Sequence, residues 1–468
     1  MITKSKRKTG RLEPLRAALI PAEVREVLDH LRAAGKQAYL VGGCVRDLLA
    51  GGRAEDFDVA TDARPEEVQR LFRRTAPTGV KHGTVTVLGR RGQYEVTTFR
   101  RDGAYGDARH PDEVSFAATL EEDLSRRDFT FNALAYDPSR ELLVDPYGGA
   151  ADFERGVVRA VGDARERFRE DGLRPLRAVR LAARFEFELD AATFDAIPAS
   201  LDRVRLVAAE RVRDELLKML ATAPRPSYGF ELMRRTGLLE LLLPELLEGY
   251  SVTQNEFHAY DIYDHALYTC DAAPAEKPLV RLAALLHDVG KARTRMVREG
   301  RVTFYNHQAV GKRMAAGILD RLRFSKRDRD HVLHLIYHHM FGYTAEWTDA
   351  AVRRFIRKVG EENIADLFDL RLADWFGNGL NRGFPGYLRK LHRRIDDAIA
   401  RDEAFTVKDL AVDGHDVMAA LSLPPGPAVG EALEYLLERV LADPTLNDAE
   451  RLRELMREKF APGAGTTG

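Results

Sequence analysis

The stretch VGGCVRDLLAGGRAEDFDVAT, residues 41–61, decides the fold of the front of this chain. The apolar segment AYLV runs into a pair of glycines, and this pattern predicts a strand that ends at a tight turn. VRDLLAG then predicts the start of a helix, and DFDVAT, rich in β-branched and aromatic residues, predicts a second strand. Residues 22–35 have the pattern of an amphipathic helix, and further strand and helix patterns continue to DPYGG at 145–149, which indicates a mixed α/β module over residues 21–150.

Two aspartates in this stretch are candidate metal ligands. Side chains alternate between the faces of a strand, so Asp56 and Asp58 are expected on one face, with the phenylalanine between them in the core. Mg²⁺ binds proteins through one or two carboxylates and takes its remaining ligands from phosphates and water. Gly42 and Gly43 let the backbone approach a polyphosphate, and Arg46 adds a cationic fork. The segment therefore predicts magnesium-dependent phosphoryl transfer on a nucleotide.

Each of these features alone has a plainer explanation. An Asp-x-Asp pair on a half-buried strand is commonly just its solvated face, and a single glycine pair is weak evidence for phosphate binding. Glu95, in the strand pattern YEVTTF, is either a third catalytic carboxylate or a residue that faces water. The joint spacing of the features favours the catalytic interpretation.

The rest of the chain is predicted to be helical and to form further domains. A chain of 468 residues, 45% of them hydrophobic, is too long for one ordinary domain. Its net charge of -1 gives no global field for a polyanion, so a nucleic-acid partner must be held by local patches. The two cysteines are too few for a disulfide scaffold, and no apolar run is long enough to cross a bilayer, so we expect a cytoplasmic protein.

Three longer stretches narrow the family: RRDFTFNALAYD at 126–137, DPYGGAADFERGVVRAVGD at 145–163 and REDGLRPLRAVRLAARFEFEL at 169–189. With the first segment they resemble the polymerase-beta-like nucleotidyltransferases. Among these, the chain is most similar to the bacterial (class II) tRNA nucleotidyltransferases, the CCA-adding enzymes, and to their relatives the poly(A) polymerases. The resemblance runs without a large gap over residues 38–222.

The resemblance implies roles for individual residues. Asp56 and Asp58 would bind magnesium, with Glu95 as a candidate third catalytic carboxylate. Arg127, the second arginine of RRDFT, would contact the triphosphate, and the element EDGLR would read the incoming base. The implied nucleotide-binding set is Gly42, Gly43, Arg46, Arg127, Asp171, Arg174, Arg177 and Arg180.

One pair in this set also has an independent rationale. Asp171 and Arg174 are three residues apart, so on a helix they are neighbours and present an acceptor together with a forked donor. Such a pair matches the edge of cytosine or adenine, and the alternative is an ordinary salt bridge on a helix surface. Pro175 is tolerated only in the first turn of a helix, which predicts that this helix begins near Leu173.

Histidines and aspartates then recur in an order that resembles the HD metal-dependent phosphohydrolases: HALYTC, ALLHDVGKA, NHQAVGKR, LIYHHM and RLADWF. Imidazole and carboxylate ligands suit a divalent transition metal and an activated water. A second ion is also open, although a lone histidine on a helix is more commonly a packed residue. The resemblance implies a first-ion set of His265, His287, Asp288 and Asp374, and the candidates for a second ion are His307, His338 and His339.

The sequence as a whole predicts an α+β protein, with a polymerase-beta-like nucleotidyltransferase α/β head followed by an all-α neck, body and tail. The expected parts are a basic extension (1–20), the catalytic head (21–150), a neck that recognises the base (151–222), a body with the HD domain (223–375) and a tail that binds tRNA (376–468).

The resemblance implies an enzyme that adds CCA to the 3′ end of tRNA from CTP and ATP, by two-metal in-line attack of the 3′-hydroxyl on the α-phosphate. No membrane partner is expected. An A-adding half-enzyme and a poly(A) polymerase stay open, because all three share these motifs. From a different class, an HD phosphohydrolase with a nucleotide-binding but non-catalytic front half also stays open.

Overall fold

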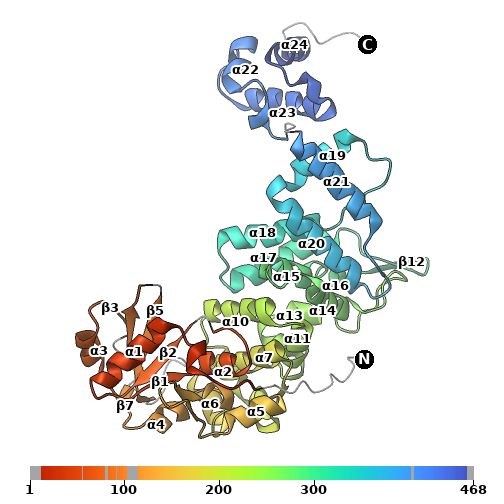
Figure 1. The fold of residues 1–468 in the computed structure, drawn as a ribbon. Coiled ribbons are helices and arrows are strands. Elements are labelled where there is room, and N and C mark those ends of the chain that lie inside the picture. Colours follow the sequence, from red (N-terminus) through yellow and green to blue (C-terminus); the bar gives the residue numbers. More distant parts are fainter. Residues whose placement is uncertain are drawn as a thin grey trace. The chain divides into compact units, whose positions relative to one another are not determined.

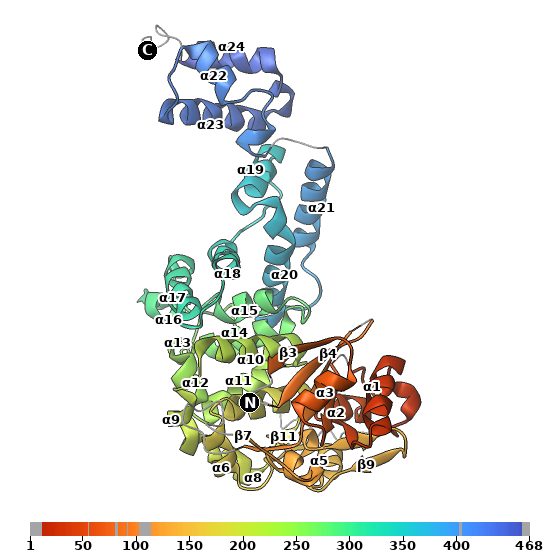
Figure 2. The ribbon, with the colours of Figure 1, turned by 90° about the vertical axis from the view of Figure 1, so that its left-hand side faces the viewer.

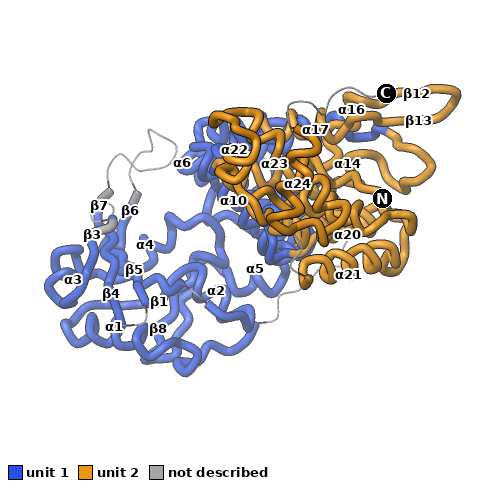
Figure 3. The backbone as a smooth tube through the Cα atoms, turned by 90° about the horizontal axis from the view of Figure 1, so that it is seen from above, with its two compact units in different colours: residues 1–252, 275–282, 317–325 blue, residues 253–274, 283–316, 326–468 orange. Residues whose placement is uncertain are grey.

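The computed structural model describes residues 12–54, 56–79, 83–90, 92–102, 114–401 and 405–460. The chain divides into two compact units (Figure 3). The first unit comprises residues 1–252, 275–282 and 317–325, and the second comprises residues 253–274, 283–316 and 326–468. The predicted boundaries of head, neck, body and tail stay predictions. Among the described residues, no helix is long and apolar enough to span a membrane.

The first unit is built on a mixed seven-stranded sheet with the order β3-β4-β5-β2-β1-β8-β9. Only β2 and β5 run parallel among the described pairings of this sheet; the others are antiparallel. The strands are β1 (Ala38–Val41), β2 (Asp58–Thr61), β3 (Thr75–Gly79), β4 (Thr84–Leu88), β5 (Gln93–Thr98), β8 (Ala135–Asp137) and β9 (Leu142–Val144). The predicted α/β head is confirmed.

The alternation of side chains along β1 and β2 gives this sheet two different faces. Leu40 and Val59 lie on one face, in a core shared with helices α1 (Ala22–Ala33), α2 (Gly43–Leu49) and α3 (Pro65–Leu71) (Figures 1 and 2). Val41 and Ala60 belong to a second core, on the other face, with helix α4 (Leu120–Ser125). Helix α1 buries Val24, Val27, Leu28 and Leu31, the spacing of one helical face, so the helix predicted from residue 22 is confirmed.

A separate short strand pair is formed by β6 (Arg100–Asp102) and β7 (Val114–Phe116). After β9, the first unit continues in helices and one further short pair, β10 (Val157–Val158) with β11 (Glu188–Leu189). Helix α7 (Arg174–Phe185) is the central one: it packs against α10 (Ala209–Thr222) and α11 (Pro226–Arg235). Leu173 caps α7 and Pro175 lies in its first turn, which confirms the predicted start. The remaining helices of this part are α5 (Gly149–Arg155), α6 (Ala164–Glu170), α8 (Ala191–Ala196), α9 (Leu201–Val204), α12 (Leu238–Leu242) and α13 (Pro244–Leu247).

In the second unit, α14 (Ile262–Ala272) packs closely along α20 (Glu361–Gly377). Gly377 makes this approach possible, because a Cβ atom there would lie 2.3 Å from Oγ1 of Thr269. The unit boundary divides two helices, α15 (Pro278–Leu286) and α17 (His307–Arg321), so that only residues 283–286 and 307–316 of them belong to the second unit. The other elements of this unit are α16 (Lys291–Thr294), the hairpin β12 (Met296–Arg298) with β13 (Arg301–Thr303), α18 (Lys326–His338), α19 (Asp349–Val359), α21 (Gly386–Ala400), α22 (Gly414–Leu421), α23 (Pro427–Ala442) and α24 (Ala449–Phe460). The predicted helical character of this region is confirmed.

Candidate functional site

The carboxylates of the first unit gather at the start of β2. Asp58 is the first residue of that strand and stands opposite Glu95 of β5 in the parallel register. Phe57 and Val59 are buried, as expected. The expectation that both aspartates lie on the strand is wrong for Asp56, because the strand begins only at Asp58 and Asp56 lies exposed in the bend before it.

These acidic groups influence one another electrostatically. Burial raises the pKa of Asp58; the charge of Arg127 opposes that shift, and the negative charges of Glu95 and Asp56 add to it. The charges of Glu95 and Asp56 therefore disfavour ionisation of Asp58, and a cation nearby would favour it. Oxygen ligands of this kind fit a hard divalent ion.

The glycine pair forms a turn against which two arginines lie. Gly42 has φ of 77° and ψ of -132°, a backbone conformation that side chains rarely adopt. A Cβ atom on Gly42 would lie 2.5 Å from Nη1 of Arg127, and one on Gly43 would lie 3.5 Å from Nη2 of Arg46. The absence of side chains at both positions therefore leaves room for two guanidinium groups beside the turn.

A chain of polar contacts links this turn to helix α7. Arg46 Nη1 donates to Oδ1 of Asn132 at 2.6 Å, and Asn132 Nδ2 donates to Oδ1 of Asp128 at 2.9 Å. The other carboxylate oxygen of Asp128 accepts from Nη2 of Arg177 at 2.5 Å. Burial alone would raise the pKa of Asp128, but the charge of Arg177 and the hydrogen bonds from Arg177 and Asn132 together outweigh burial and hold this pKa well below its usual range. Sequence reasoning missed Asp128 and Asn132, although both lie within the segment RRDFTFN that it singled out.

Arg180, one helical turn beyond Arg177, has its own carboxylate partner. Its Nε atom donates to Oε2 of Glu215 on α10 at 2.5 Å, and Nη1 of Arg177 lies 3.8 Å from Oε1 of the same residue. Burial lowers the pKa of Arg180, and Glu215 opposes that shift. Two of the predicted nucleotide-binding arginines are thus held in place by Glu215.

Asp171 and Arg174 do not form the expected pair on one helical face. Asp171 lies in extended backbone between α6 and α7, because α7 begins only at Arg174. Its carboxylate pairs instead with Arg211, with 3.2 Å from Nη1 to Oδ1 and 3.0 Å from Nη2 to Oδ2. Arg174 donates to Oε2 of Glu170 at 2.5 Å. The prediction of an i to i+3 pair is therefore wrong, because the proline that starts the helix leaves Asp171 outside it.

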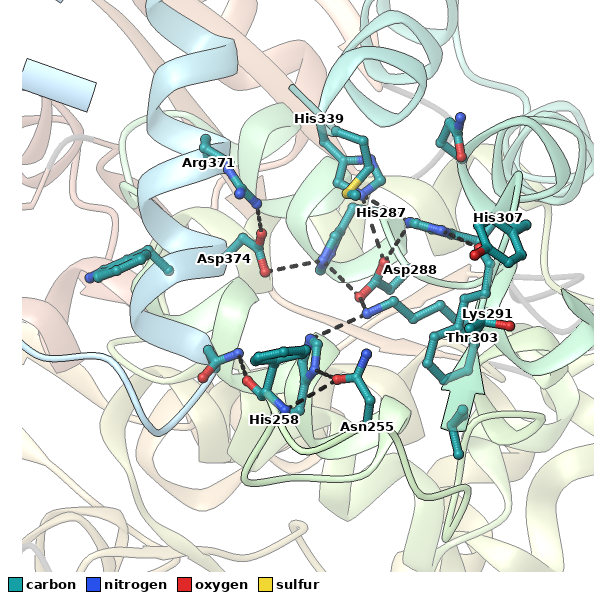
Figure 4. Close-up of a pocket in the computed structure, with 18 of the residues that line it drawn as sticks. Asn255, His258, His287, Asp288, Lys291, Thr303, His307, His339, Arg371 and Asp374 are labelled. Atoms are coloured by element: carbon teal, nitrogen blue, oxygen red, sulfur yellow. Dashed lines mark hydrogen bonds and ion pairs between the residues drawn. The ribbon is translucent and has the colours of Figure 1, made fainter. Parts of the chain in front are cut away.

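The metal-binding candidates of the second unit converge around Asp288 (Figure 4). His265 comes from α14, His287 and Asp288 directly follow α15, and Asp374 comes from α20. Oδ2 of Asp288 lies 3.3 Å from Nε2 of His265 and 3.2 Å from Nε2 of His287. Oδ1 of Asp374 lies 3.2 Å from Nε2 of His265 and 3.7 Å from Nε2 of His287. His265, His287 and Asp288 lie close enough together to ligate one ion, and Asp374 lies beside both imidazoles of that group.

A second group forms on the other side of the same carboxylate. Oδ1 of Asp288 lies 3.3 Å from Nε2 of His307 and 3.7 Å from Nε2 of His339. All three side chains are buried. His338 is in neither three-residue group found among the described residues, and its ring stacks 4.4 Å from that of His334.

The imidazole tautomers show what these groups can bind. Nδ1 of His287, His307 and His339 lies 2.7, 2.8 and 2.7 Å from the carbonyl oxygens of Ala284, Phe304 and Ile336. A carbonyl can only accept a hydrogen bond, so Nδ1 carries the proton, and Nε2 of a neutral ring presents a lone pair. Nε2 of His307 and Nε2 of His339 then face each other at 3.3 Å, beside a carboxylate oxygen. Acceptors packed in this way require a cation among them.

Two further observations agree with a cation site. Within the described residues, Nε2 of His265, Nε2 of His287 and Oδ1 of Asp288 are buried without a hydrogen-bond partner. Burial alone would lower the pKa of His287, but the charges and hydrogen bonds of Asp288 and Asp374 together outweigh burial and raise this pKa to about 10. The excess negative charge of the pocket therefore attracts a proton, or the divalent ion that imidazole and carboxylate ligands suit.

The two candidate groups are together called the HD cluster, which comprises His265, His287, Asp288, His307, His339 and Asp374. This cluster opens into a cavity of about 820 Å³. Nζ of Lys291 lies 2.6 Å from Oδ2 of Asp288, and Nη1 of Arg371 donates to Asp374 at 2.5 Å. Phe257 and Tyr305, 67% and 72% exposed, also line the cavity. Sequence reasoning missed Lys291 and Arg371; Lys291 lies three residues after Asp288 in ALLHDVGK, one helical turn along the chain.

Three family models match the chain in sequence order. The poly A polymerase head domain matches residues 38–159, and the probable RNA and SrmB-binding site of polymerase A matches residues 186–249. The HD domain matches residues 257–379, which contain both candidate metal-binding groups.

Curated relatives and a solved structure agree with these matches. The CCA-adding enzyme of Lactobacillus johnsonii is 46% identical over 214 residues, which are 46% of this chain and 53% of that protein. The chain thus aligns with about half the length of such relatives. The CCA-adding enzyme of Leuconostoc mesenteroides is 31% identical over 93% of this chain and 96% of its own length. The crystal structure of the Bacillus stearothermophilus CCA-adding enzyme in complex with CTP matches with a TM-score of 0.73 and 30% identity, over 93% of this chain and 96% of that chain.

Proposed function

This chain belongs to the family of CCA-adding enzymes, as its similarity to relatives over nearly its whole length shows, and from this premise we propose that it is a template-independent tRNA nucleotidyltransferase. Its substrates would be tRNA, CTP and ATP, and its product would be the CCA end. In this reaction the 3′-hydroxyl of the tRNA attacks the α-phosphate in line, a phosphodiester bond forms, and pyrophosphate leaves.

Asp56 and Asp58 would hold magnesium, and Glu95 stands beside Asp58 as a further carboxylate. The ions would supply the positive charge that the developing charge on the phosphate requires. Arg46 and Arg127, which lie against the Gly42–Gly43 turn, would bind the triphosphate. The observation that carries the proposal is this juxtaposition: Asp58 with Glu95 opposite it and Asp56 just before it, and two guanidinium groups at the adjacent glycine turn.

Base selection would fall to the start of α7. The carboxylate of Asp171 can accept a hydrogen bond from the amino group that cytosine and adenine share. Helix α7 begins with Arg174 and also carries Arg177 and Arg180. These three arginines would complete the nucleotide site.

Incubation of the full chain with tRNA lacking its CCA end and with labelled CTP or ATP tests the proposal. Incorporation of both nucleotides is expected, and Asp58→Ala should abolish it, because a half-buried ligand of the proposed catalytic ion is lost. His287→Ala, in the other unit, is the matched control and should leave incorporation intact. Full incorporation by Asp58→Ala would contradict the assignment. Incorporation of A alone would indicate an A-adding enzyme, and long A tails would indicate a poly(A) polymerase.

A second activity is favoured by the opposed Nε2 atoms of the HD cluster. We propose that this cluster holds two divalent transition ions on either side of Asp288, with His265, His287 and Asp374 for one and His307 and His339 for the other. Such ions would activate a water for phosphoester hydrolysis. Hydrolysis of p-nitrophenyl phosphate that is abolished by His287→Ala but retained by Asp58→Ala is the expected result. Hydrolysis without any nucleotide incorporation would favour the HD phosphohydrolase with a non-catalytic front half.

A further inference from the structure

The carboxylate of Asp171 depends on a residue far along the chain for its orientation. It lies in the connection between α6 and α7, where neither helix fixes its side chain. One local contact is present, the N–H of Leu173 donating to Oδ1 at 3.0 Å. The remaining contacts are the two from Arg211, which engage both carboxylate oxygens. A planar guanidinium that binds both oxygens of a carboxylate fixes its plane as well as its position.

Arg174 does not perform this function. Its Nη1 donates to the carbonyl of Arg167 at 2.9 Å as well as to Glu170, and its Nη2 donates to the carbonyl of Arg126 at 2.9 Å. Its side chain is only 9% exposed. None of these contacts is to Asp171, so the cation that binds Asp171 comes from α10 instead.

Helix α10 holds both signs of charge in the predicted nucleotide site. Arg211 and Glu215 are four residues apart, so they lie on the same face of this helix. Glu215 binds Arg180, and Arg211 binds Asp171. One face of α10 therefore fixes the carboxylate of Asp171, an acceptor, relative to the guanidinium of Arg180, a donor.

We propose that Arg211 is a positioning residue for base selection. It holds the plane of the Asp171 carboxylate so that one oxygen can accept from the amino group at N4 of cytosine or N6 of adenine. Uracil and guanine carry a carbonyl oxygen at the corresponding place, which a fixed carboxylate repels. This inference rests on the proposed base-reading role of Asp171 and extends it to a residue 40 positions later in the sequence.

Without Arg211 the carboxylate keeps only the contact from the N–H of Leu173 to Oδ1, so its plane is no longer fixed and water can reach Oδ2. The correct base must then order and desolvate it, which weakens CTP and ATP binding, while the wrong bases lose little. The loss should therefore fall mainly on KM for the correct nucleotide. A merely structural role of Arg211 would instead lower kcat for all nucleotides alike.

The test compares Arg211→Gln with the wild type in single-nucleotide incorporation by the full chain. The measured quantities are the ratios of kcat/KM for CTP over UTP and for ATP over GTP, on tRNA ending before each addition. A fall of about tenfold in at least one ratio is expected, since a hydrogen bond to a charged group contributes about that much. Arg213→Gln is the matched control: it lies on the same helix with a side chain exposed to nearly the same extent, 23% against 22%, and should keep both ratios.

Two further variants keep the inference open to refutation. Arg211→Lys retains the charge but cannot bind both carboxylate oxygens in the same way, so it should recover part of the loss. If Arg211→Gln does not fold, Arg211→Lys serves as the test instead. Unchanged kcat/KM ratios in Arg211→Lys would then overturn the proposal. If Asp171→Ala lowers the ratios and Arg211→Gln does not, the positioning role is overturned while the base-reading role stands. Unchanged ratios in Asp171→Ala would overturn both.

Discussion

Nη2 of Arg177 meets Oδ2 of Asp128 at 2.5 Å, and this pair joins α7 to the segment that carries Arg127. The same carboxylate accepts from Asn132, which in turn accepts from Arg46. Four residues that come from α2, α7 and the turn region between α4 and β8 are therefore locked into one polar chain. The arginines at its two ends cannot change position independently.

Replacement of Asp128 by asparagine should destabilise the protein, because Arg177 is left partly buried without its anion. We expect the free energy of unfolding in urea to fall by about 3 kcal/mol. Asp214→Asn is the control: this carboxylate is 51% exposed and pairs with Arg213 at the surface, so the change should be below about 1 kcal/mol.

The stability difference between wild type and Asp128→Asn should depend on pH. The pKa of Asp128 is lower in the folded protein than the value of about 3.9 expected when unfolded, so its contribution is complete above that value. It should be lost as the pH falls below about 4. Urea titrations of both proteins at a series of pH values measure this, and a difference that stays constant down to pH 3 would contradict the assignment.

Gly42→Ala should displace Arg127 and reduce nucleotide incorporation. The new Cβ atom would lie 2.5 Å from its guanidinium, in addition to the cost of a positive φ. Gly35→Ala is a matched control, since Gly35 also has φ of 77° but has no atom within 4 Å of the Cβ position. Both variants should lose about 1 to 3 kcal/mol of stability. Only Gly42→Ala should lose incorporation at a temperature at which both are folded, and equal loss in both would refute the role of the contact.

Glu95→Gln should shift the pH dependence of incorporation. The negative charge of Glu95 helps to raise the pKa of Asp58, so its removal lowers that pKa and extends metal binding to more acidic conditions. The acid limb of the pH–rate profile should therefore move to lower pH, whatever the change in maximal rate. Glu66→Gln, an exposed change of the same charge on α3, should leave the limb in place.

His339→Ala and His338→Ala, at adjacent positions, should differ in metal content. His339 belongs to the group with Asp288 and His307, whereas His338 does not. After dialysis against Mn²⁺, mass spectrometry should find about one equivalent less metal in His339→Ala than in wild type. His338→Ala should bind the wild-type amount, and a loss of metal in it would contradict the two-ion proposal.

Sequence patterns predicted the helices and strands well where the signal lies within a few neighbouring residues. The α/β head, the helix from residue 22 and the start of α7 near Leu173 all follow from periodicity and from a proline in the first turn. The pairing of Asp171 with Arg211 could not be predicted, because it joins residues 40 positions apart across two helices. Spacing of three residues implies proximity only if one helix contains both, and here the helix starts too late.

In the HD cluster, too, the sequence alone could not identify every residue that the structure brings together. The order of motifs indicated His265, His287, Asp288 and Asp374, but neither spacing nor composition separates His338 from His339, which are neighbours in the chain. Helix α18 ends at His338, and only the residue beyond its end turns towards Asp288. Lys291 carried a detectable signal, since residues three apart lie on one side of a turn.

His287 and His339 each directly follow the last residue of a helix, α15 and α18, and each ring is tied to a carbonyl of that final turn. Insertion or deletion of one residue in either turn would swing the imidazole by about 100° around the helix axis. Evolutionary and engineered changes of length are therefore restricted at these two helix ends, whatever residues occupy the surrounding positions.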